Sequence, residues 1–352
     1  MRSALLKGVF ASVAAGALIA TAGCTTRNEP SPAAAPTGTA ASSASQPASS
    51  EFTVAFVPKL QGIPYFEAMK TGGEAAAKEI PGLKWVYQGP TTADPAAQAD
   101  IVRSLVQQKV DVLFVAPNDP DSLAPVLEEA KTAGIIVGTS DTDAPNSVRE
   151  LFVNQATSEG LGSTIAETLA TAMGGKGTAA IVSCGETATN LNAWIKVEEA
   201  TFKSKYPDIK LLPTVYAGED QAKATQMATD LINANPNLTG LIGQCTTSAP
   251  GVAQAVKDAG KIGKVFTTGL GTPKAMLPYL QDGSSSGSVL WDVEALGYLT
   301  AWAGAQLKAG TPIDANPTVG SIKGVTYDAA SKTLLLGPPT VFTKDNAGKY
   351  NY

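Results

Sequence analysis

Histidine is absent from the 352 residues of this chain, and only three cysteines occur in it. Without an imidazole, the chain has no Ser-His-Asp or Cys-His nucleophile pair and no histidine-ligated metal site. Charged residues are also scarce, at 16%, and the formal net charge is −5. A weakly acidic chain lacks the basic surface that binding to nucleic acid requires. The composition therefore predicts no nucleic-acid partner, and we expect no metal and no cofactor.

Long apolar runs are equally few, and the one that stands out covers residues 8 to about 20, behind two basic residues. It is shorter than the roughly 20 residues that a membrane-spanning helix needs, so it is typical of an export signal. The run ends at Thr21-Ala22-Gly23-Cys24, which resembles the cleavage motif of bacterial lipoproteins, although leucine is more usual than Thr21. We expect a signal peptide over residues 1–23 and acylation of the Cys24 thiol. An ordinary secreted protein is the alternative.

Residues 25–50 are almost entirely small or polar, with one Arg and one Glu. Such a segment cannot bury enough apolar surface to offset the entropy of ordering it. We therefore expect residues 24–50 to form a disordered tether that links an acylated cysteine to a folded part starting near Glu51. Two or more acyl chains make a stable anchor. The protein is accordingly expected on the outer face of the cytoplasmic membrane or in the periplasm, in contact with the membrane through its lipid anchor only.

The remaining part, about 300 residues, is long enough for two domains. Short apolar runs rich in β-branched residues alternate with helical segments, which is typical of strands buried on both faces of a parallel sheet. Asp94-Pro95 and Asp119-Pro120 each place a helix cap before a proline, and Gly134 supplies a helix stop. The predicted strands of the first half are 52–57, 84–87, 112–116, 135–138 and 151–153, with helices near 65–80, 95–109 and 120–133.

The second half repeats this alternation, and a last helix over about 294–309 follows it. Its predicted strands are 179–183, 211–216, 240–243, 265–268 and 288–290, with helices near 158–173, 190–205, 220–234, 248–259 and 273–282. The pattern predicts an α/β fold with two doubly wound parallel-sheet lobes and right-handed crossovers. In such a fold the ligand cleft lies between the carboxyl ends of the two sheets.

A multi-strand hinge is expected to join the two lobes. Asn154-Gln155 and Trp291-Asp292 are predicted to be two of the crossings, and a third is expected between Asn316 and Gly324. The expected first lobe comprises residues 51–153 plus about 293–320, and the expected second lobe comprises 154–292 plus about 321–352. Hinged lobes of this kind close over a ligand.

Five local motifs occur in order along the chain: Ala55-Phe56-Val57-Pro58-Lys59-Leu60, Tyr87-Gln88-Gly89-Pro90-Thr91, Val153-Asn154-Gln155, Leu290-Trp291-Asp292-Val293 and Asn346-Ala347-Gly348-Lys349-Tyr350. With the lipoprotein motif, they resemble the type I solute-binding proteins of bacterial sugar ABC importers, in the ribose-binding class. The likeness is greatest to the branch of autoinducer-2-binding and rhamnose-binding proteins, and it covers essentially all of residues 51–352. It implies the periplasmic binding protein type I fold and a monomer without enzymatic activity. It also implies delivery of a ligand to an ABC permease with its cytoplasmic ATPase.

The resemblance implies a ligand site in loops that follow the first-lobe strands. Lys59 can donate to a ligand oxygen, and Tyr65 and Phe66 fall where the class places aromatic rings against the C–H face of a sugar. Asp141 can accept two hydroxyl hydrogen bonds at once and is the strongest candidate. Asp143, in the same turn, is a further candidate. A solvated loop lysine and an aromatic pair in the core are the alternatives for Lys59 and for the two rings.

Other candidates lie at the crossings and in the second lobe. They are Asn154, Gln155, Asn190, Trp194, Gln244, Trp291 and Asp292. For Asn154 and Gln155, a role in the hinge is open beside ligand binding, and Trp194 suits the core as well as the ligand.

The second lobe departs from the autoinducer-2-binding pattern. Those proteins carry Asp-Gln at the start of a helix where this chain has Asn190-Leu191, and Pro-Asp-Ala after a strand where it has Gln244-Cys245-Thr246. The second lobe is therefore expected to define a different ligand. Neutral amides, threonines and carboxylates suit a small neutral sugar or sugar alcohol. An autoinducer-2-type signal receptor is the alternative. A further alternative is a glycosidase that pairs two of the carboxylates of Asp141, Asp143 and Asp292, but the resemblance is to binding proteins.

Cys184 and Cys245 end the first and third predicted strands of the second half. Those strands are neighbours in the usual doubly wound order, and adjacent strands lie about 4.8 Å apart. We therefore expect a disulfide between the two cysteines.

Overall fold

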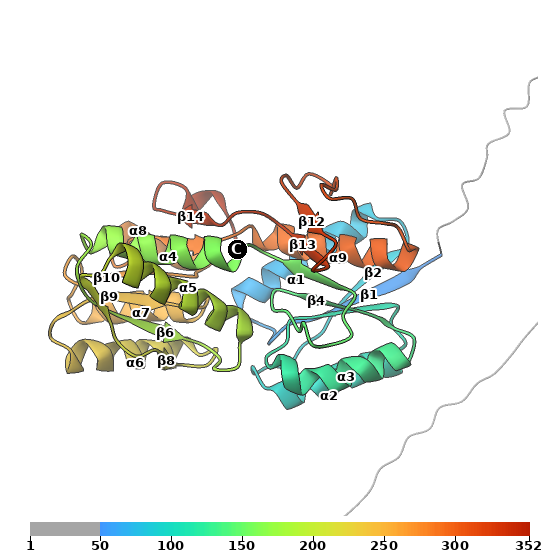
Figure 1. Ribbon diagram of the computed structural model, residues 1–352, viewed down its shortest axis with the longest axis horizontal. Coiled ribbons are helices and arrows are strands. Elements are labelled where there is room, and N and C mark those ends of the chain that lie inside the picture. Colours follow the sequence, from blue (N-terminus) through green and yellow to red (C-terminus); the bar gives the residue numbers. More distant parts are fainter. Residues whose placement is uncertain (1–49) are drawn as a thin grey trace, which may run out of the picture. The chain divides into compact units, whose positions relative to one another are not determined.

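The computed structural model describes residues 50–352 (Figure 1). The predicted signal peptide, the acylation site at Cys24 and the predicted tether up to residue 49 lie outside the described residues. The described part has two α/β lobes, and its sheets are mostly parallel. The predicted fold class is therefore confirmed. No helix among residues 50–352 is both long enough and apolar enough to cross a membrane.

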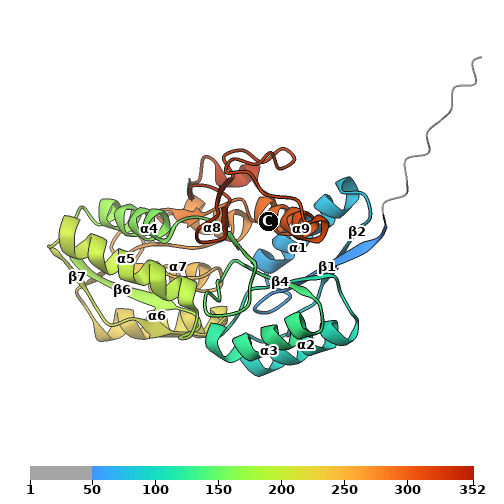
Figure 2. The same ribbon diagram turned by 45° about the vertical axis from the view of Figure 1, so that its right-hand side comes forward.

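The first lobe contains a seven-stranded sheet in the order β12-β13-β5-β4-β3-β1-β2. Its strands are β1 (Phe52–Val57), β2 (Leu83–Tyr87), β3 (Val112–Val115), β4 (Ile136–Ser140), β5 (Leu151–Asn154), β12 (Thr326–Asp328) and β13 (Thr333–Leu335). Its helices are α1 (Pro64–Glu79), α2 (Pro95–Gln107), α3 (Pro120–Thr132) and α9 (Val293–Ala309). In Figure 2, α2 and α3 lie on one face of this sheet and α1 and α9 on the other.

Local sequence explains where the helices of this lobe begin. The carboxylate of Asp94 accepts a hydrogen bond from the Ala97 amide at 2.9 Å, and a proline follows each of the two capping aspartates. Helix α9 comes from far along the chain and packs closely on α1. A Cβ atom at Gly72 or at Gly297 would overlap the backbone of the facing helix, so only glycine allows this approach.

The second lobe contains a five-stranded sheet in which β6 is central, with β9 and β10 on one side and β7 and β8 on the other. Its strands are β6 (Gly177–Ser183), β7 (Ile209–Leu211), β8 (Val215–Tyr216), β9 (Leu238–Gly243) and β10 (Phe266–Gly269). Its helices are α4 (Ser158–Ala172), α5 (Thr189–Lys205), α6 (Gln221–Ala234), α7 (Ser248–Asp258) and α8 (Pro273–Asp282). The structure joins Cys184 to Cys245 by a disulfide across the ends of β6 and β9, with the two Cα atoms 6.1 Å apart.

Two short strands stand apart from both large sheets. Strand β11 (Ser288–Leu290) was predicted to belong to the second sheet, but it pairs in antiparallel fashion with β14 (Thr340–Phe342). A short 3₁₀ helix, η1 (Ala347–Lys349), follows β14. The late segment that returns as β14 thus gives β11 a partner.

The last crossing lies further along the chain than the sequence predicts. Strand β13 pairs in parallel with β5, so the chain is still in the first lobe at Leu335 and crosses within residues 336–339. It does not cross between Asn316 and Gly324, and residues 326–335 belong to the first lobe. Strands β12 and β13 are three residues each, which is too short to show a periodic pattern.

Candidate functional site

A cavity of about 40 Å³ lies between the two lobes, at the carboxyl ends of the parallel strands. Its lining comes from both lobes and from the crossing after β11. The lining residues are Lys59, Ile63, Tyr65, Phe66, Asp141, Asn190, Leu191, Trp194, Glu219, Cys245, Thr246, Leu270, Leu290 and Trp291. Seven of the twelve candidates from the sequence are among them: Lys59, Tyr65, Phe66, Asp141, Asn190, Trp194 and Trp291.

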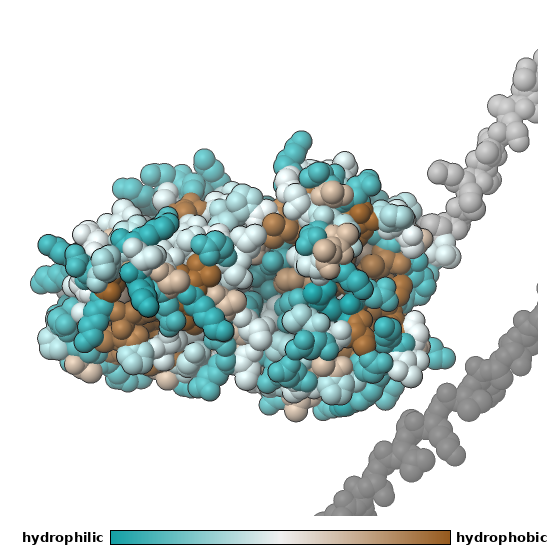
Figure 3. Space-filling view, viewed as in Figure 1, coloured by the Kyte–Doolittle hydropathy of each residue, from teal (hydrophilic) through white to brown (hydrophobic). Residues whose placement is uncertain are grey.

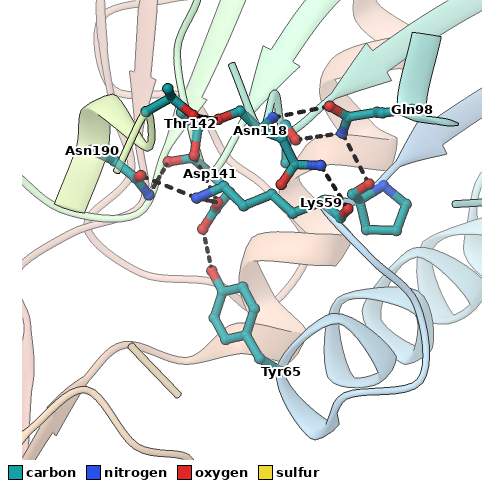
Figure 4. Close-up of polar contacts among 10 residues, drawn as sticks. Lys59, Tyr65, Gln98, Asn118, Asp141, Thr142 and Asn190 are labelled. Carbon is teal, nitrogen blue, oxygen red and sulfur yellow. Dashed lines mark hydrogen bonds and ion pairs between the residues drawn. The ribbon is translucent and has the colours of Figure 1, made fainter. Parts of the chain in front are cut away.

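Asp141 is the carboxylate at the centre of the site (Figure 4). It follows β4 with φ at 69°, a left-handed conformation that aspartate tolerates better than most residues, and it is 4% exposed. The Tyr65 hydroxyl donates to its Oδ1 at 2.6 Å, and the Thr142 hydroxyl donates to its Oδ2 at 3.0 Å. Burial, and then the negative charge of Asp141, raise the pKa of Tyr65 well above its usual range. Tyr65 therefore remains a donor at every physiological pH.

Lys59 brings the only buried ammonium group to this cavity among the described residues. Its Nζ lies 3.7 Å from Oδ2 of Asp141. The same Nζ donates to Oδ1 of Asn190 in the second lobe at 3.1 Å. Lys59 thus connects the carboxylate of one lobe to the amide of the other, as Figure 4 shows.

Two buried amides that sequence reasoning missed hold the Lys59 loop in place. Gln98 is fully buried, and its Nε2 donates to the carbonyl oxygens of Pro58 and Ala116 at 3.0 and 2.7 Å. Its Oε1 accepts from the Asn118 amide at 2.9 Å, and the Asn118 side chain donates to the Lys59 carbonyl at 2.8 Å. Because these bonds tie the ends of β1 and β3 together, the backbone at Lys59 is fixed without any help from a ligand.

Four aromatic rings form the hinge-side wall of the cavity. Tyr65 packs edge-on against Phe66 and Trp291, with ring centroids 4.9 and 5.8 Å apart, and Trp194 packs edge-on against Trp291 at 5.9 Å. All four side chains are at most 4% exposed. The Trp291 indole N–H is buried and has no hydrogen-bond partner among residues 50–352. Tyr352 steadies this crossing, since its hydroxyl donates to the Trp291 carbonyl at 3.2 Å.

Glu219, in the loop after β8, is the carboxyl group that the second lobe adds to the cavity, and sequence reasoning missed it. Burial raises the pKa of Glu219, and the nearby Lys59 opposes that effect. The Thr247 hydroxyl donates to its Oε2 at a long 3.4 Å. No sequence signal marks this residue, because β8 has only two residues.

Two predicted carboxylates do not reach the cavity. Asp143 is occupied within the first lobe, where the Arg149 guanidinium donates to its Oδ2 at 2.8 Å and the Thr139 hydroxyl to its Oδ1 at 2.7 Å. Asp292 is exposed and caps α9, with its Oδ1 accepting from the Ala295 amide at 2.9 Å. The structure therefore gives both groups structural partners in place of a ligand.

Three predicted amides also lie apart from the cavity lining. Gln244 is fully buried, and its Nε2 donates to Oε1 of Glu198 on α5 at 2.7 Å. Gln155 is fully buried at the first crossing, and its amide has no hydrogen-bond partner among the described residues. The Asn154 carbonyl accepts from the Leu336 amide at 2.8 Å. The crossing residues Asn154 and Gln155 thus lie in the hinge.

The lobes also touch outside the cavity. The Thr187 hydroxyl of the second lobe donates to the Asn118 carbonyl of the first at 3.0 Å. Next to the cavity, the surface between the lobes opens into a groove of about 740 Å³, lined by the loops at the carboxyl ends of strands in both lobes. Figure 3 shows that hydrophilic residues cover much of one face of the molecule and that this face is hollowed where the lobes meet.

Comparison with known proteins identifies the family. Residues 54–312 match the family described as a periplasmic binding protein domain. The D-allose-binding periplasmic protein of Escherichia coli is 30% identical over 238 residues, which cover 65% of this chain and 75% of that protein. The xylitol-binding protein of Mycolicibacterium smegmatis is 29% identical over 178 residues, which cover 48% of each protein.

Two solved structures share the whole two-lobed arrangement. A solute-binding protein of an ABC transporter from Clostridium phytofermentans, solved with bound L-rhamnose, superposes with a TM-score of 0.80 at 29% identity and covers 86% of this chain and 98% of that one. LsrB from Clostridium saccharobutylicum, solved in complex with AI-2 (autoinducer-2), has a TM-score of 0.80 at 26% identity and covers 85% and 100%. The chain belongs to the periplasmic binding protein family, as a type I solute-binding protein of the kind that serves ABC importers. The resemblance seen in the sequence is confirmed, and these relatives are binding proteins and not enzymes.

Proposed function

We propose that this member of the periplasmic binding protein family captures a small neutral sugar or sugar alcohol between its lobes and delivers it to an ABC permease. The observation that supports this most directly is the first-lobe cluster around Asp141. A buried carboxylate with fixed donors beside it can accept two hydroxyl hydrogen bonds, and charge makes such bonds strong. Relatives described as binding D-allose and xylitol support the same ligand class.

The charges around the cavity favour a ligand without net charge. One ammonium group, at Lys59, faces the carboxylate of Asp141 at 3.7 Å. The second carboxyl group, at Glu219, has its pKa raised by burial. Because a buried charge needs a partner, and Asp141 and Lys59 already supply one another's, an ionic ligand would leave one charge of the cavity uncompensated. A hydroxyl group, in contrast, can bond to either.

Cavity size and contacts suggest how binding and closure are coupled. One water molecule needs roughly 10–15 Å³ of cavity volume, so a cavity of about 40 Å³ holds only a few water molecules. It is therefore too small for a monosaccharide. A sugar must therefore separate the lobes or turn the side chains that meet there, above all Lys59 and Asn190. The bound sugar then takes the place of that direct contact and bridges the lobes. It favours the closed state only by the difference between its contacts in the two states.

A thermal-shift screen of the purified protein tests this function. The panel contains aldoses, deoxysugars and alditols of four to six carbons, together with AI-2. We expect at least one sugar or alditol to raise the melting temperature by several degrees, because a ligand that binds only the folded state stabilises it by mass action. If no sugar or alditol in the panel raises it, the proposed ligand class is wrong.

The similarity to the structure solved with AI-2 favours a second candidate, a receptor for that signal. Asn190, Leu191 and Gln244 weigh against it, because AI-2-binding members resembling this chain carry other residues at those positions. A stabilising effect of AI-2 with no effect of any sugar would replace the first proposal with this one.

The membrane anchor is part of the same proposal. Cys24 ends a motif that resembles the lipoprotein cleavage site, so we infer that its thiol is acylated and that the binding lobes remain outside the cytoplasm near the permease. Growth of the expressing bacterium with an alkyne-tagged palmitate should label the wild-type protein and leave Cys24→Ser unlabelled. Equal labelling of both proteins would contradict the anchor.

A further inference from the structure

We propose that Cys184, Cys245 and Glu219 form a binding site for a thiophilic divalent metal ion such as Zn²⁺ when the disulfide is reduced. The Sγ atoms of the two cysteines and a carboxylate oxygen of Glu219 all lie within 4.8 Å of one another. The absence of histidine does not rule out such a site, because cysteine thiolates and carboxylates also bind zinc. Such a site is independent of the capture of a sugar.

The Thr247 hydroxyl lies among all three of these groups. Its oxygen is 3.4 Å from the sulfur of Cys184, 3.1 Å from the sulfur of Cys245 and 3.4 Å from Oε2 of Glu219. The groups therefore converge on one place from three segments of the chain. Tetrahedral zinc with bonds of about 2.3 Å to sulfur holds two sulfurs roughly 3.8 Å apart. Once the S–S bond is broken, side chains on Cα atoms 6.1 Å apart reach that separation by rotation about their Cα–Cβ bonds.

The surroundings of Cys245 favour the thiolate form that a metal ion requires. Cys245 lies just before helix α7, and the N-terminus of a helix stabilises a nearby thiolate. The Ser248 amide donates to its sulfur at 3.4 Å. Two thiolates, one carboxylate and one divalent cation leave a single negative charge in excess, and the Lys59 ammonium lines the same cavity as Cys245 and Glu219. The charges around the site therefore suit a bound divalent cation.

Metal ions and reductants have a route to the site from solvent. Cys245 lines the cavity between the lobes, and Glu219 and Thr247 line the groove of about 740 Å³ that opens next to it. Three protein ligands leave the fourth position of a tetrahedral zinc ion to a water molecule. The place of the site at the junction of cavity and groove provides the space for that water.

Only the reduced protein has the complete ligand set. A dithiol reductant supplies two electrons and two protons, the S–S bond breaks, and Cys184 and Cys245 become thiols while the reductant becomes a disulfide. The metal ion then displaces the two thiol protons, which pass to the solvent. In the oxidised protein, Glu219 is the one ligand left, so that form binds the metal weakly.

Zinc titration of the purified protein in both oxidation states tests this inference. The full chain carries Cys24→Ser, so that no third thiol is present. It is reduced with a dithiol, freed of the reductant without air, and titrated with Zn²⁺ against a chromophoric chelator. We expect one Zn²⁺ per reduced chain and no stoichiometric binding to the oxidised chain.

Thermal unfolding distinguishes a folded site from thiols of the unfolded chain. A metal that binds the folded state stabilises it, so Zn²⁺ should raise the melting temperature of the reduced protein by several degrees and leave that of the oxidised protein unchanged. Three results overturn the inference: a disulfide that resists the dithiol in the folded protein, no zinc bound by the reduced chain, or a melting temperature of the reduced protein that Zn²⁺ lowers or leaves unchanged.

Glu219→Gln tests the geometry of the site, because this variant keeps both thiols. Changing even an outer partner of a metal ligand costs about tenfold to 100-fold in affinity, so we expect at least tenfold weaker zinc binding by the reduced variant. Glu186→Gln is the matched control, at an exposed position close to Cys184 in the chain, and its zinc affinity should equal that of the wild type. Wild-type affinity in Glu219→Gln, or an equal loss in both variants, contradicts the site. Should Glu219→Gln fail to fold, Glu219→Asp, which shortens the side chain by one methylene group, makes the same test.

Discussion

The two lobes contribute very different halves to the cavity between them. In the first lobe, the polar groups are held by other polar groups: Asp141 by Tyr65 and Thr142, and the Lys59 loop by Gln98 and Asn118. In the second lobe, Asn190 bonds mainly across the interface and Glu219 has one long bond from Thr247, while the rest of the wall is largely apolar.

This difference assigns different tasks to the two halves. A preorganised carboxylate loses little entropy on binding and accepts any hydroxyl pair of suitable spacing, so we propose that the first lobe supplies affinity for sugars in general. A close-packed wall tolerates only ligands of the right shape, so we propose that the second lobe selects among them. What holds that wall in place is packing together with the disulfide at its base.

The largest effect is expected from removing the disulfide that holds the second half. The bond closes a loop with a sequence separation of 61, so Cys184→Ala with Cys245→Ala should lower the free energy of unfolding by about 4 kcal/mol. Chemical denaturation of the variant and of the wild type, each with and without reductant, measures it. A loss below about 1 kcal/mol would contradict this prediction, because the second-lobe wall would then keep its stability without the disulfide.

Asp141→Asn should remove most of the binding that the first half supplies. Asparagine also tolerates a positive φ, so the change isolates the charge from the backbone conformation. Loss of a buried charged partner costs on the order of 2–5 kcal/mol, so the affinity for every sugar that binds should fall about 100-fold. The measurement is titration calorimetry across the panel.

Asp143→Asn is the matched control for that variant, because Asp143 lies two residues away and bonds to Arg149 outside the cavity. We expect it to lower the melting temperature and to change sugar affinity by less than about twofold. Wild-type affinity in Asp141→Asn, or an equal loss in both variants, would show that the first half does not work as described.

Glu198→Gln should reveal how the second half responds to pH. Burial raises the pKa of Glu198 to about 8 from an ordinary 4.5, against the bond donated by Gln244. The folded protein thus holds a proton that the unfolded chain releases between those values. As far as this group is concerned, stability is therefore greatest below pH 4.5, and it falls as the pH rises from there to about 8.

Denaturation between pH 5 and pH 9 measures this dependence. The glutamine variant should lack the Glu198 part of the decline and be the more stable protein at pH 9. Glu128→Gln, at an exposed position on α3 in the other lobe, should follow the wild-type curve. Parallel curves for the wild type and Glu198→Gln would mean that Glu198 is not held neutral.

The smallest effect is expected at Glu219, the loosely held carboxyl group of the second half. Because its one bond within the protein is long, Glu219→Gln should weaken the tightest sugar only about threefold to fivefold, roughly 1 kcal/mol. The substitution should change which sugars of the panel bind more tightly than others, and it should change their average affinity little. A uniform 100-fold loss of affinity for all sugars would mean that Glu219, and not Asp141, is the main carboxylate that binds the ligand.

Much of the fold and the first-lobe half of the site could be predicted from the sequence. Residues that directly follow buried parallel strands meet at one edge of the sheet, and Lys59 and Asp141 occupy such places. At the end of β9, in contrast, the sequence did not show which of two neighbouring residues lines the cavity. Neighbouring residues at a strand end face opposite sides, so Cys245 lines the cavity while Gln244 turns to Glu198.

The roles of three acidic residues could not be predicted, because each depends on which group the carboxylate bonds to in the folded protein. An aspartate before a helix suits a cap as well as a ligand, and Asp292 is the cap of α9. Asp143 shares its turn with Asp141, but an arginine six residues further on takes up its charge. Glu219 has no pattern around it, because its position depends on a two-residue strand pairing with β6. Residue type and spacing do not contain this information, and only the packed structure does.

The most direct test of the account is the position of the bound sugar, measured by crystallography of the protein with the tightest ligand of the panel. We expect a sugar between the lobes, with hydroxyl groups on Asp141 and Lys59 and with its ring against the aromatic wall of Tyr65, Trp194 and Trp291. A sugar bound outside this cavity, or bound in it without a hydrogen bond to Asp141, would contradict the proposed site.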